Sequence, residues 1–401
     1  MSNNKKLNIH IKPLGLLDLL KFKGLVKARQ KMIEKGPTTP ILVSPNPNTL
    51  AKQLHPRLQV MKISKIIEYS KDVKSYILVP SNPNEKCVIH RAGQYLSVKL
   101  KIVTSLVSRP YSICSLPNDQ YYEISIKRSI FVSNYILDNW KINDSVEVSC
   151  PEGNFYYETL RDEKNVIGLA GGCGITPFLS MAKAIASKIE DFNLTILYGC
   201  RKGSDALFSR EFKELEAKCN GKLKVVYVIS DETIEGCESG FITKQLIEKY
   251  APTDSKYSIF ICGPQAMYKF CEKEFEKLNL DRRHIREELF GEVKDVTSLK
   301  EYPKEFVGKQ YNLTVIAYNN TYKIPCKSEE SLLVAIERAG LNIQSKCRSG
   351  ECGWCRSRLV SGNVFVPVSA EHTRLADRKY GYIHPCSSYP LSDVTLDVPL
   401  E

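Results

Sequence analysis

The alternation of apolar and polar positions changes character along the chain. Between residues 57 and 158, short runs alternate or are rich in β-branched residues, as in VMKISKI, SYILVP, YLSVKL, YYEISIKR and SVEVSC. Turn-forming stretches such as SNPNEK and LPND separate these runs, which is typical of strands joined by short connections. About six strands of this kind predict an antiparallel β-barrel.

Residues 159–290 show a second pattern, in which apolar strand-like runs alternate with helical ones. The strand-like runs are NVIGLA, NLTILYG, LKVVYVIS and YSIFIC. The helical patterns between or after them are TPFLSMAKAIASK, SREFKELEAK, ITKQLIEKY and PQAMYKFCEKEFEKL. Regular alternation of this kind predicts an α/β module with a doubly wound parallel sheet.

The C-terminal part holds a third pattern. Residues 291–310 are charged and contain Pro303, so we expect a linker. Residues 311–401 carry the strand-like runs YNLTVIA, TYKIPC and SDVTLDVP, the helical run SLLVAIERAG and a loop rich in cysteine. This order predicts a small α+β module of the β-grasp type.

Residues 1–56 differ from the rest and are expected to form a basic extension and a linker. A short helix is predicted near residues 14–35, with an apolar stripe of Leu16, Leu17, Leu20 and Leu25, and Gly36-Pro37 should end it. Such a helix can lie on an anionic membrane or dock a partner. The alternative is a helix packed on its own protein with its lysines in water.

Composition is that of an ordinary globular protein, with 43% hydrophobic and 25% charged residues among 401. The net charge is +12, but residues 1–35 supply +7 of it, from eight lysines and one arginine against two acids. No nucleic-acid-binding motif accompanies this charge, so we expect no nucleic-acid partner. No signal-peptide or membrane-span pattern is found, and most of the 14 cysteines are scattered singly. Both features favour a cytoplasmic location.

Four cysteines near the C-terminus carry the strongest chemical signal. Cys347, Cys352, Cys355 and Cys386 have the spacing Cys-x4-Cys-x2-Cys-x30-Cys. A compact loop of three cysteines with one remote cysteine is the plant-type ferredoxin pattern for a [2Fe–2S] cluster. Zinc is the alternative metal, but its ligands usually come as two short-spaced pairs, and only one such pair is present.

Two further motifs lie in the first two modules. In the barrel region, Arg109-Pro110-Tyr111-Ser112 combines a group that can hold a phosphate with a ring that can stack on a flavin. Directly after the strand NVIGLA, the sequence GGCGITP forms a glycine-rich turn into a helix, where a pyrophosphate can approach the helix N-terminus. The turn is not a complete G-x-G-x-x-G, because Pro177 takes the place of the third glycine.

Together these motifs resemble the ferredoxin-NADP reductase superfamily, in its three-module form with a C-terminal plant-type ferredoxin domain. The resemblance covers residues 57–401. It implies a flavin barrel at 57–158, an NAD(P)-binding domain at 159–290, a linker at 291–310 and a ferredoxin domain at 311–401. It also implies cofactor-binding roles for the following residues: Arg109, Pro110, Tyr111, Ser112, Lys127, Val132, Ser133, Asn134, Gly171, Gly172, Gly174, Thr176, Pro177, Gly263, Pro264 and Met267.

The resemblance also identifies residues near the reacting groups. Cys262, in Cys-Gly-Pro after the fourth strand of the second module, would lie beside the nicotinamide, and Phe290 would cover the flavin or compete with the nicotinamide for its face. Arg201 or Lys202 could bind a 2′-phosphate, but many NADH-using relatives also carry an arginine there, so we expect NADH only slightly more than NADPH. The resemblance favours FAD over FMN.

The implied activity is transfer of electrons from NAD(P)H through FAD and the [2Fe–2S] cluster to a partner redox protein. The acceptor would be an oxygenase or an anaerobic redox enzyme. Lys346, Arg348, Arg356 and Arg358 surround the cysteine loop, so the acceptor is expected to present acidic residues. The alternatives are a self-contained reductase of a flavin, quinone or metal ion, and a redox sensor that uses the cluster as a signal.

Overall fold

The computed structural model describes residues 13–36, 47, 50–51, 56–278, 280–293, 295–370 and 375–400. The chain divides into two units, residues 1–54 and 55–401, and each is described by itself. Among the described residues, no helix combines the length and the hydropathy that crossing a bilayer requires.

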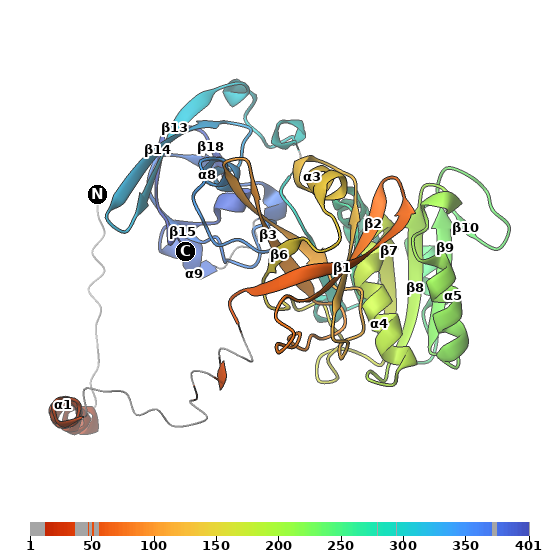
Figure 1. Cartoon of the computed structure of the whole chain (residues 1–401), viewed down its shortest axis with the longest axis horizontal. Helices are drawn as coiled ribbons and strands as arrows, with labels where there is room; N and C mark the ends of the chain where they lie inside the picture. The colour runs from red at the N-terminus through yellow and green to blue at the C-terminus, as the bar shows by residue number, and fades with distance from the viewer. Residues whose placement is uncertain are drawn as a thin grey trace. The chain divides into compact units, whose positions relative to one another are not determined.

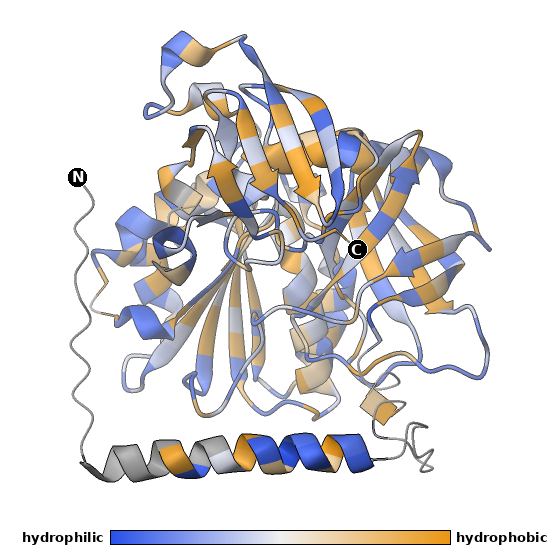
Figure 2. Cartoon of the chain, turned by 90° about the vertical axis from the view of Figure 1, so that its left-hand side faces the viewer, coloured by the Kyte–Doolittle hydropathy of each residue, from blue (hydrophilic) through white to orange (hydrophobic). Residues whose placement is uncertain are grey.

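The first unit contains one long helix, α1 (Pro13–Lys35), which confirms the helix predicted at residues 14–35. Of the predicted apolar stripe, the described side chains of Leu20 and Leu25 are 63% and 65% exposed. The side chains of Leu16 and Leu17 lie outside the described set. Hydrophobic and hydrophilic residues are mixed along the described part of α1 (Figure 2).

A curled antiparallel sheet begins the second unit and confirms the predicted barrel (Figure 1). Its strands follow the order β4-β3-β6-β1-β2-β5. The two outer strands approach each other through an isolated bridge between Ile113 and Ile124, so the sheet nearly closes around its apolar core. The elements of this barrel module are β1 (Gln59–Ser70), β2 (Val73–Pro80), β3 (Tyr95–Ile102), β4 (Ser105–Ser112), β5 (Tyr122–Lys127), α3 (Phe131–Asn139) and β6 (Ser145–Val148).

The next module is a six-stranded parallel sheet in the order β10-β9-β8-β7-β11-β12. One apolar cluster contains residues of α4 and α5, and another contains residues of α6 and α7, so helices cover both faces as predicted. The order reverses between β7 and β11, and open α/β sheets bind ligands at such a reversal. Its elements are β7 (Asn165–Gly171), α4 (Thr176–Ala186), β8 (Asn193–Cys200), α5 (Ser209–Lys218), β9 (Leu223–Ile229), β10 (Glu238–Ser239), α6 (Lys244–Tyr250), β11 (Tyr257–Cys262), α7 (Gln265–Phe275) and β12 (Ile285–Glu288).

The C-terminal module is a mixed five-stranded sheet in the order β14-β13-β19-β15-β17, with a small second sheet of β16 and β18. The parallel pairing of β13 with β19 and the packing of α8 on the sheet are those of a β-grasp fold. Its elements are β13 (Gln310–Ala317), β14 (Asn320–Lys327), α8 (Leu332–Arg338), β15 (Ser357–Ser361), β16 (Val364–Phe365), α9 (Leu375–Lys379), β17 (Tyr382–Ile383), β18 (Tyr389–Pro390) and β19 (Val394–Asp397).

The segment predicted as a linker, residues 291–310, is more ordered than its charge suggested. Val296, Leu299 and Tyr302 are buried in one cluster with Tyr389 of β18. The Tyr302 hydroxyl donates to the Ser328 carbonyl at 3.1 Å. This segment is therefore packed against the C-terminal module and is not a loose tether.

Candidate functional site

The glycine-rich turn after β7 lies against the turn after β11. A Cβ on Gly174 would stand 1.9 Å from the Cys262 carbonyl oxygen, and one on Gly171 would stand 2.6 Å from the Met267 sulfur. A Cβ on Gly263 would likewise meet the Met267 sulfur at 2.7 Å. The structure thus brings together two of the predicted motifs, Gly171–Pro177 and Cys262–Met267, at the point where the strand order reverses.

Gly172 has a different environment from its neighbours. Its φ is +52°, in the left-handed region, and no atom lies within 4 Å of an added Cβ. Thr176 and Pro177 begin α4, and the Thr176 hydroxyl donates to the Cys173 carbonyl at 2.8 Å. An open glycine next to a helix N-terminus leaves room for an anionic group at the backbone amides.

Cys262 ends β11 and is 5% exposed. Burial and the neighbouring Glu288 raise the pKa of its thiol well above the ordinary value, so this sulfur is protonated at neutral pH. The Tyr268 hydroxyl lies 3.3 Å from the Gly263 nitrogen and also bonds the Glu288 carbonyl. These contacts fix the Cys-Gly-Pro turn relative to β12.

Glu288 is a candidate site residue that the sequence did not predict. It ends β12 beside Cys262 in the parallel register, it is 6% exposed, and its Oε2 has no hydrogen-bond partner. Burial raises the pKa of its carboxyl well above the ordinary value. A buried acid with a strongly raised pKa and an oxygen without a hydrogen-bond partner is a frequent mark of a functional site. The signal in the sequence was only the pair Glu287-Glu288.

The Arg-x-Tyr-Ser motif lies at the end of β4. Ser112 is buried, and Tyr111 packs against the apolar core of the barrel, while Pro110 pairs with Ser97 of β3. The guanidinium of Arg109 donates to the Ser108 carbonyl at 2.8 Å and lies 3.7 Å from the Glu337 carboxylate of α8. Burial and nearby Arg348 lower the pKa of Arg109.

The second part of the predicted flavin site is the start of α3. Val132 is buried in the same barrel core, and Lys127 at the end of β5 is exposed. The Ser133 hydroxyl and the Asn134 side-chain oxygen accept from the Ser129 N–H at 3.1 and 3.2 Å. The first N–H groups of a helix have no partners within the helix, so this end can receive an anion.

Arg201 follows β8, the strand that pairs in parallel with β7. Its Nε donates to Asp231 at 2.9 Å, and its side chain is 82% exposed. Hydrogen bonds from Ser230 and Arg201 lower the pKa of Asp231, which is therefore a carboxylate at neutral pH. Asp231 and Glu232 follow β9, and the sequence did not predict a role for either. The Glu232 carboxylate accepts a hydrogen bond from the Gly203 N–H.

Phe290 stands between the second module and the cysteine loop. Its ring meets that of Tyr95 from β3 edge-on, with centroids 4.9 Å apart. The next residue, Gly291, donates its N–H to the Cys347 carbonyl at 3.0 Å. The segment that follows β12 therefore joins the barrel to the first cysteine of the predicted cluster.

The four predicted ligand cysteines form two pairs of thiols. The Cys355 and Cys386 sulfurs are 3.4 Å apart, and the Cys352 N–H lies 3.4 Å from the Cys347 sulfur. In the described part of the chain, no group of three or more His, Cys, Asp or Glu side chains is placed to hold a single metal ion. A four-cysteine [2Fe–2S] site supplies two thiolates to each of two irons, and two pairs fit that requirement.

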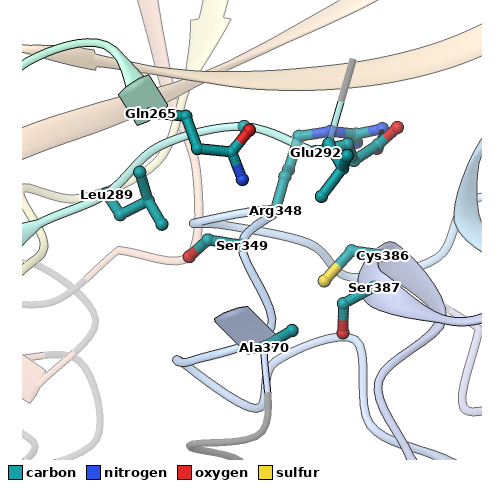
Figure 3. A pocket seen from close by; sticks show the side chains of 10 residues that line it. Gln265, Leu289, Glu292, Arg348, Ser349, Ala370, Cys386 and Ser387 are labelled. Carbon is teal, nitrogen blue, oxygen red and sulfur yellow. Dashed lines mark hydrogen bonds and ion pairs between the residues drawn. The ribbon is translucent and has the colours of Figure 1, made fainter. Parts of the chain in front are cut away.

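The loop backbone also suits a cluster. Gly350 and Gly353 have φ of +92° and +73°, and the Ser349 N–H points at the Cys347 sulfur from 3.5 Å. The hydrogen bond with Cys352 is the main cause that lowers the pKa of Cys347, and the thiolate is the form that binds metal. Figure 3 shows Cys386, Ser349 and Arg348 around a pocket that Gln265 and Leu289 of the second module also line.

The basic residues expected at the surface of the loop are placed differently from the prediction. Arg348 is 1% exposed, because its guanidinium is taken up by carboxylates inside the protein. Lys346 bonds Glu152 at 2.7 Å and lies over the Trp354 ring, 3.1 Å from its centroid. Of the four basic residues, Arg356 and Arg358 are exposed. The side chain of Trp354 in the same loop is also exposed, at 47%.

Comparison with known families finds three domains in the predicted order. The model of the oxidoreductase FAD-binding domain matches residues 60–157, that of the oxidoreductase NAD-binding domain matches 169–273, and that of the 2Fe-2S iron-sulfur cluster binding domain matches 316–391. These matches confirm FAD, NAD(P)H and a [2Fe–2S] cluster as the cofactors.

Individual relatives match this chain over most of their length. The glycine betaine monooxygenase reductase subunit of Chromohalobacter salexigens is 27% identical, over 83% of this chain and 93% of that protein. NADH oxidoreductase HCR of Escherichia coli is 26% identical, over 77% and 88%. The solved structure of phthalate dioxygenase reductase superposes with a TM-score of 0.62 at 24% identity, covering 85% of this chain and 98% of that one, and supports the fold.

The module order, the paired cysteines and the three domain matches agree with one another. The chain therefore belongs to the ferredoxin-NADP reductase superfamily, as a three-module reductase that carries FAD, NAD(P)H and [2Fe–2S] domains in that order.

Proposed function

We propose that this chain is the reductase component of an oxygenase system, taking electrons from NADH and delivering them singly to a separate acceptor protein. The observation that carries this proposal is the hydrogen bond between Gly291 and Cys347. It joins the segment that carries Phe290 to the first cluster cysteine, which would make the proposed flavin site and the cluster neighbours. The relatives named as monooxygenase reductase components support the choice of an oxygenase.

For the flavin, we propose a site built from β4 and the start of α3. Arg109 would hold a flavin phosphate, Tyr111 and Ser112 would contact the ring system, and the amides near Ser133 and Asn134 would hold the pyrophosphate. When bound, FAD accepts a hydride from NADH and releases single electrons, which the [2Fe–2S] cluster relays. The packing of Tyr111 on the barrel core and the burial of Ser112 support this placement.

For the nicotinamide, we propose the space above the two packed turns. Gly172 would leave room for the pyrophosphate of NADH, while Cys262 would line the hydride path as a neutral thiol. Glu288 would be a second polar group at that path, held beside Cys262 by the β11–β12 register. Phe290 would cover the flavin face until the nicotinamide displaces it. No side chain acts as a general acid or base, because hydride transfer moves no proton between protein and substrate.

The preference for NADH should depend on Asp231. Its carboxylate holds Arg201, a cation predicted for a 2′-phosphate, and would repel that phosphate. We expect Asp231→Asn to raise kcat/KM for NADPH relative to NADH by about tenfold, since it removes a like charge and frees Arg201. Steady-state kinetics with both nucleotides measure this ratio. Adding Arg201→Met should cancel the gain, and an unchanged ratio in Asp231→Asn would show that other residues set the preference.

The exposed Arg356, Arg358 and Trp354 form the proposed contact for the acceptor, which we expect to present acidic and apolar groups. The basic N-terminal arm is a proposed second contact, either with the acceptor or with an anionic membrane. We also propose a cytoplasmic location and the module limits 57–158, 159–290 and 311–401.

Removal of residues 1–40 tests the arm. We expect NADH-to-dye activity to stay within about twofold, because the truncated residues precede the barrel, whereas binding to the acceptor or to anionic vesicles should weaken. Dye reduction, acceptor reduction and vesicle cosedimentation are compared in the same preparations. Loss of bound flavin on truncation would contradict the proposed separation of roles.

An absorbance titration of anaerobically purified protein tests the proposed function itself. Flavin bands and the cluster absorbance should both bleach with NADH, and more weakly with NADPH. Turnover of a free flavin or quinone at physiological rates without any partner would favour a self-contained reductase instead. If neither nucleotide bleached the spectrum, the proposed reductase function would be wrong. A redox sensor that uses the cluster as a signal would then be the better hypothesis.

A further inference from the structure

Three consecutive residues of the cysteine loop contact the rest of the reductase. Lys346 forms an ion pair of 2.7 Å with Glu152, which follows the last barrel strand. Cys347 accepts the hydrogen bond from Gly291 at 3.0 Å. Arg348 donates through Nη1 to the Ser108 carbonyl of β4 at 3.2 Å. We call residues 346–348 the docking segment, because each one bonds a different part of the chain outside the C-terminal module.

Arg348 is the most constrained residue of the docking segment. Its side chain is fully buried, and its φ of +60° is unusual for a residue other than glycine. Its two terminal nitrogens bond both oxygens of Glu337, at 2.5 and 2.9 Å, and Nη2 also bonds Glu292. A buried guanidinium persists only where carboxylates and carbonyls replace its water, and here three separate segments provide them.

These partners tie the C-terminal module to the flavin barrel. Glu337 lies on α8 of the C-terminal module, yet it also accepts from the Ser108 N–H at 3.4 Å and stands 3.7 Å from Arg109. Glu292 belongs to the segment after β12. Because charged contacts of this kind depend on direction as well as distance, they fix one orientation of the module, which an apolar contact alone would not do.

We propose that Arg348 is a positioning residue that holds the C-terminal module against the flavin barrel, and that electron transfer from the flavin to the cluster depends on it. The ion pair of Lys346 with Glu152 is a second contact of this kind. The proposal rests on the proposed function. Arg348 touches neither reacting group, and it acts by keeping the cluster loop beside the segment that carries Phe290. Each transfer moves one electron from the reduced flavin to the oxidised cluster and makes or breaks no bond at Arg348.

The test is Arg348→Met in the full-length holoprotein. In anaerobic stopped-flow mixing with NADH, the flavin should bleach at the wild-type rate, and the later cluster phase should slow by at least about tenfold. A tenfold change in this rate corresponds to about 1.4 kcal/mol. Breaking a buried ion pair usually costs more free energy than this. Limited proteolysis should also cut the segment 291–310 faster, because this segment is held between the modules.

Arg338→Met is the matched control. Arg338 is an arginine of the same module whose ion pair with Glu330, at 2.9 Å, stays within that module. This variant should change neither the cluster phase nor the proteolysis. If Arg348→Met fails to fold or loses its cluster, Lys346→Met and Glu152→Gln decide the question, since both lie at the edge of the interface.

An unchanged flavin-to-cluster rate together with unchanged proteolysis, in a folded variant with the wild-type cluster spectrum, would overturn the proposal. A merely structural role would lower thermal stability and leave both of these readouts at wild-type values. Failure of the proposed function would look different, because wild-type flavin would then not bleach with NADH at all.

Discussion

Replacing Cys386 by alanine should remove the [2Fe–2S] cluster and leave the flavin half of the protein working. Cys386 is the remote ligand, in the short turn Pro385–Ser387, and its sulfur lies 3.4 Å from that of Cys355. Loss of one thiolate leaves an iron without its second protein ligand. We expect NADH-dependent reduction of cytochrome c to fall by more than about 100-fold. This exceeds the loss of activity that is usual when a residue supporting a metal ligand, and not the ligand itself, is replaced. Reduction of ferricyanide by the flavin should persist.

Cys326→Ala is the matched control for this prediction. Cys326 is 1% exposed in β14 of the same module, where its thiol donates to the Lys327 and Glu330 carbonyls and packs in the apolar core. This variant should keep the cluster absorbance and the electron paramagnetic resonance signal of the reduced cluster. Should Cys386→Ala also keep both signals and its iron, the four-cysteine assignment would be wrong.

The sequence predicted the parts of this protein that depend on local pattern. Helices such as α4 and α5 and the strands β7, β8, β9 and β11 follow from apolar periodicity, and the cysteine loop follows from spacing. The short strands β10 and β12 were missed, because their polar sequences carry no strand signal. They exist because a neighbouring parallel strand satisfies their backbone groups.

Arg348 shows why the site was less predictable than the fold. By sequence it is one of several basic residues near the cysteines, and it was expected to face an acceptor. Its partners Glu292 and Glu337 are 56 and 11 residues away, so only tertiary structure brings them together. Glu288 and Asp231 were missed for the same reason, since their significance comes from contacts with Cys262 at the end of β11 and Arg201 after β8.

Gly174→Ala should disable the use of NADH without removing either cofactor. An added Cβ would stand 1.9 Å from the Cys262 carbonyl oxygen and 2.7 Å from the Gly263 nitrogen. Both are backbone atoms and cannot rotate away, so the turns after β7 and β11 must separate. A displacement of about 1 Å in a catalytic site can cost about 100-fold in rate, and we expect a loss of this size in NADH reduction of the flavin. Stopped-flow bleaching measures it.

Gly199→Ala separates this local effect from a general weakening of the sheet. Gly199 lies in the neighbouring strand β8, and an added Cβ there would meet the Ala170 oxygen at 3.5 Å and Ile242 at 3.6 Å, which are ordinary contacts. This variant should keep wild-type rates. In Gly174→Ala, dithionite should still reduce flavin and cluster fully, since neither site includes the displaced backbone. A wild-type NADH rate in that variant would mean that the packing of the two turns does not shape the nicotinamide site, and the placement of Cys262 on the hydride path would then lose its support.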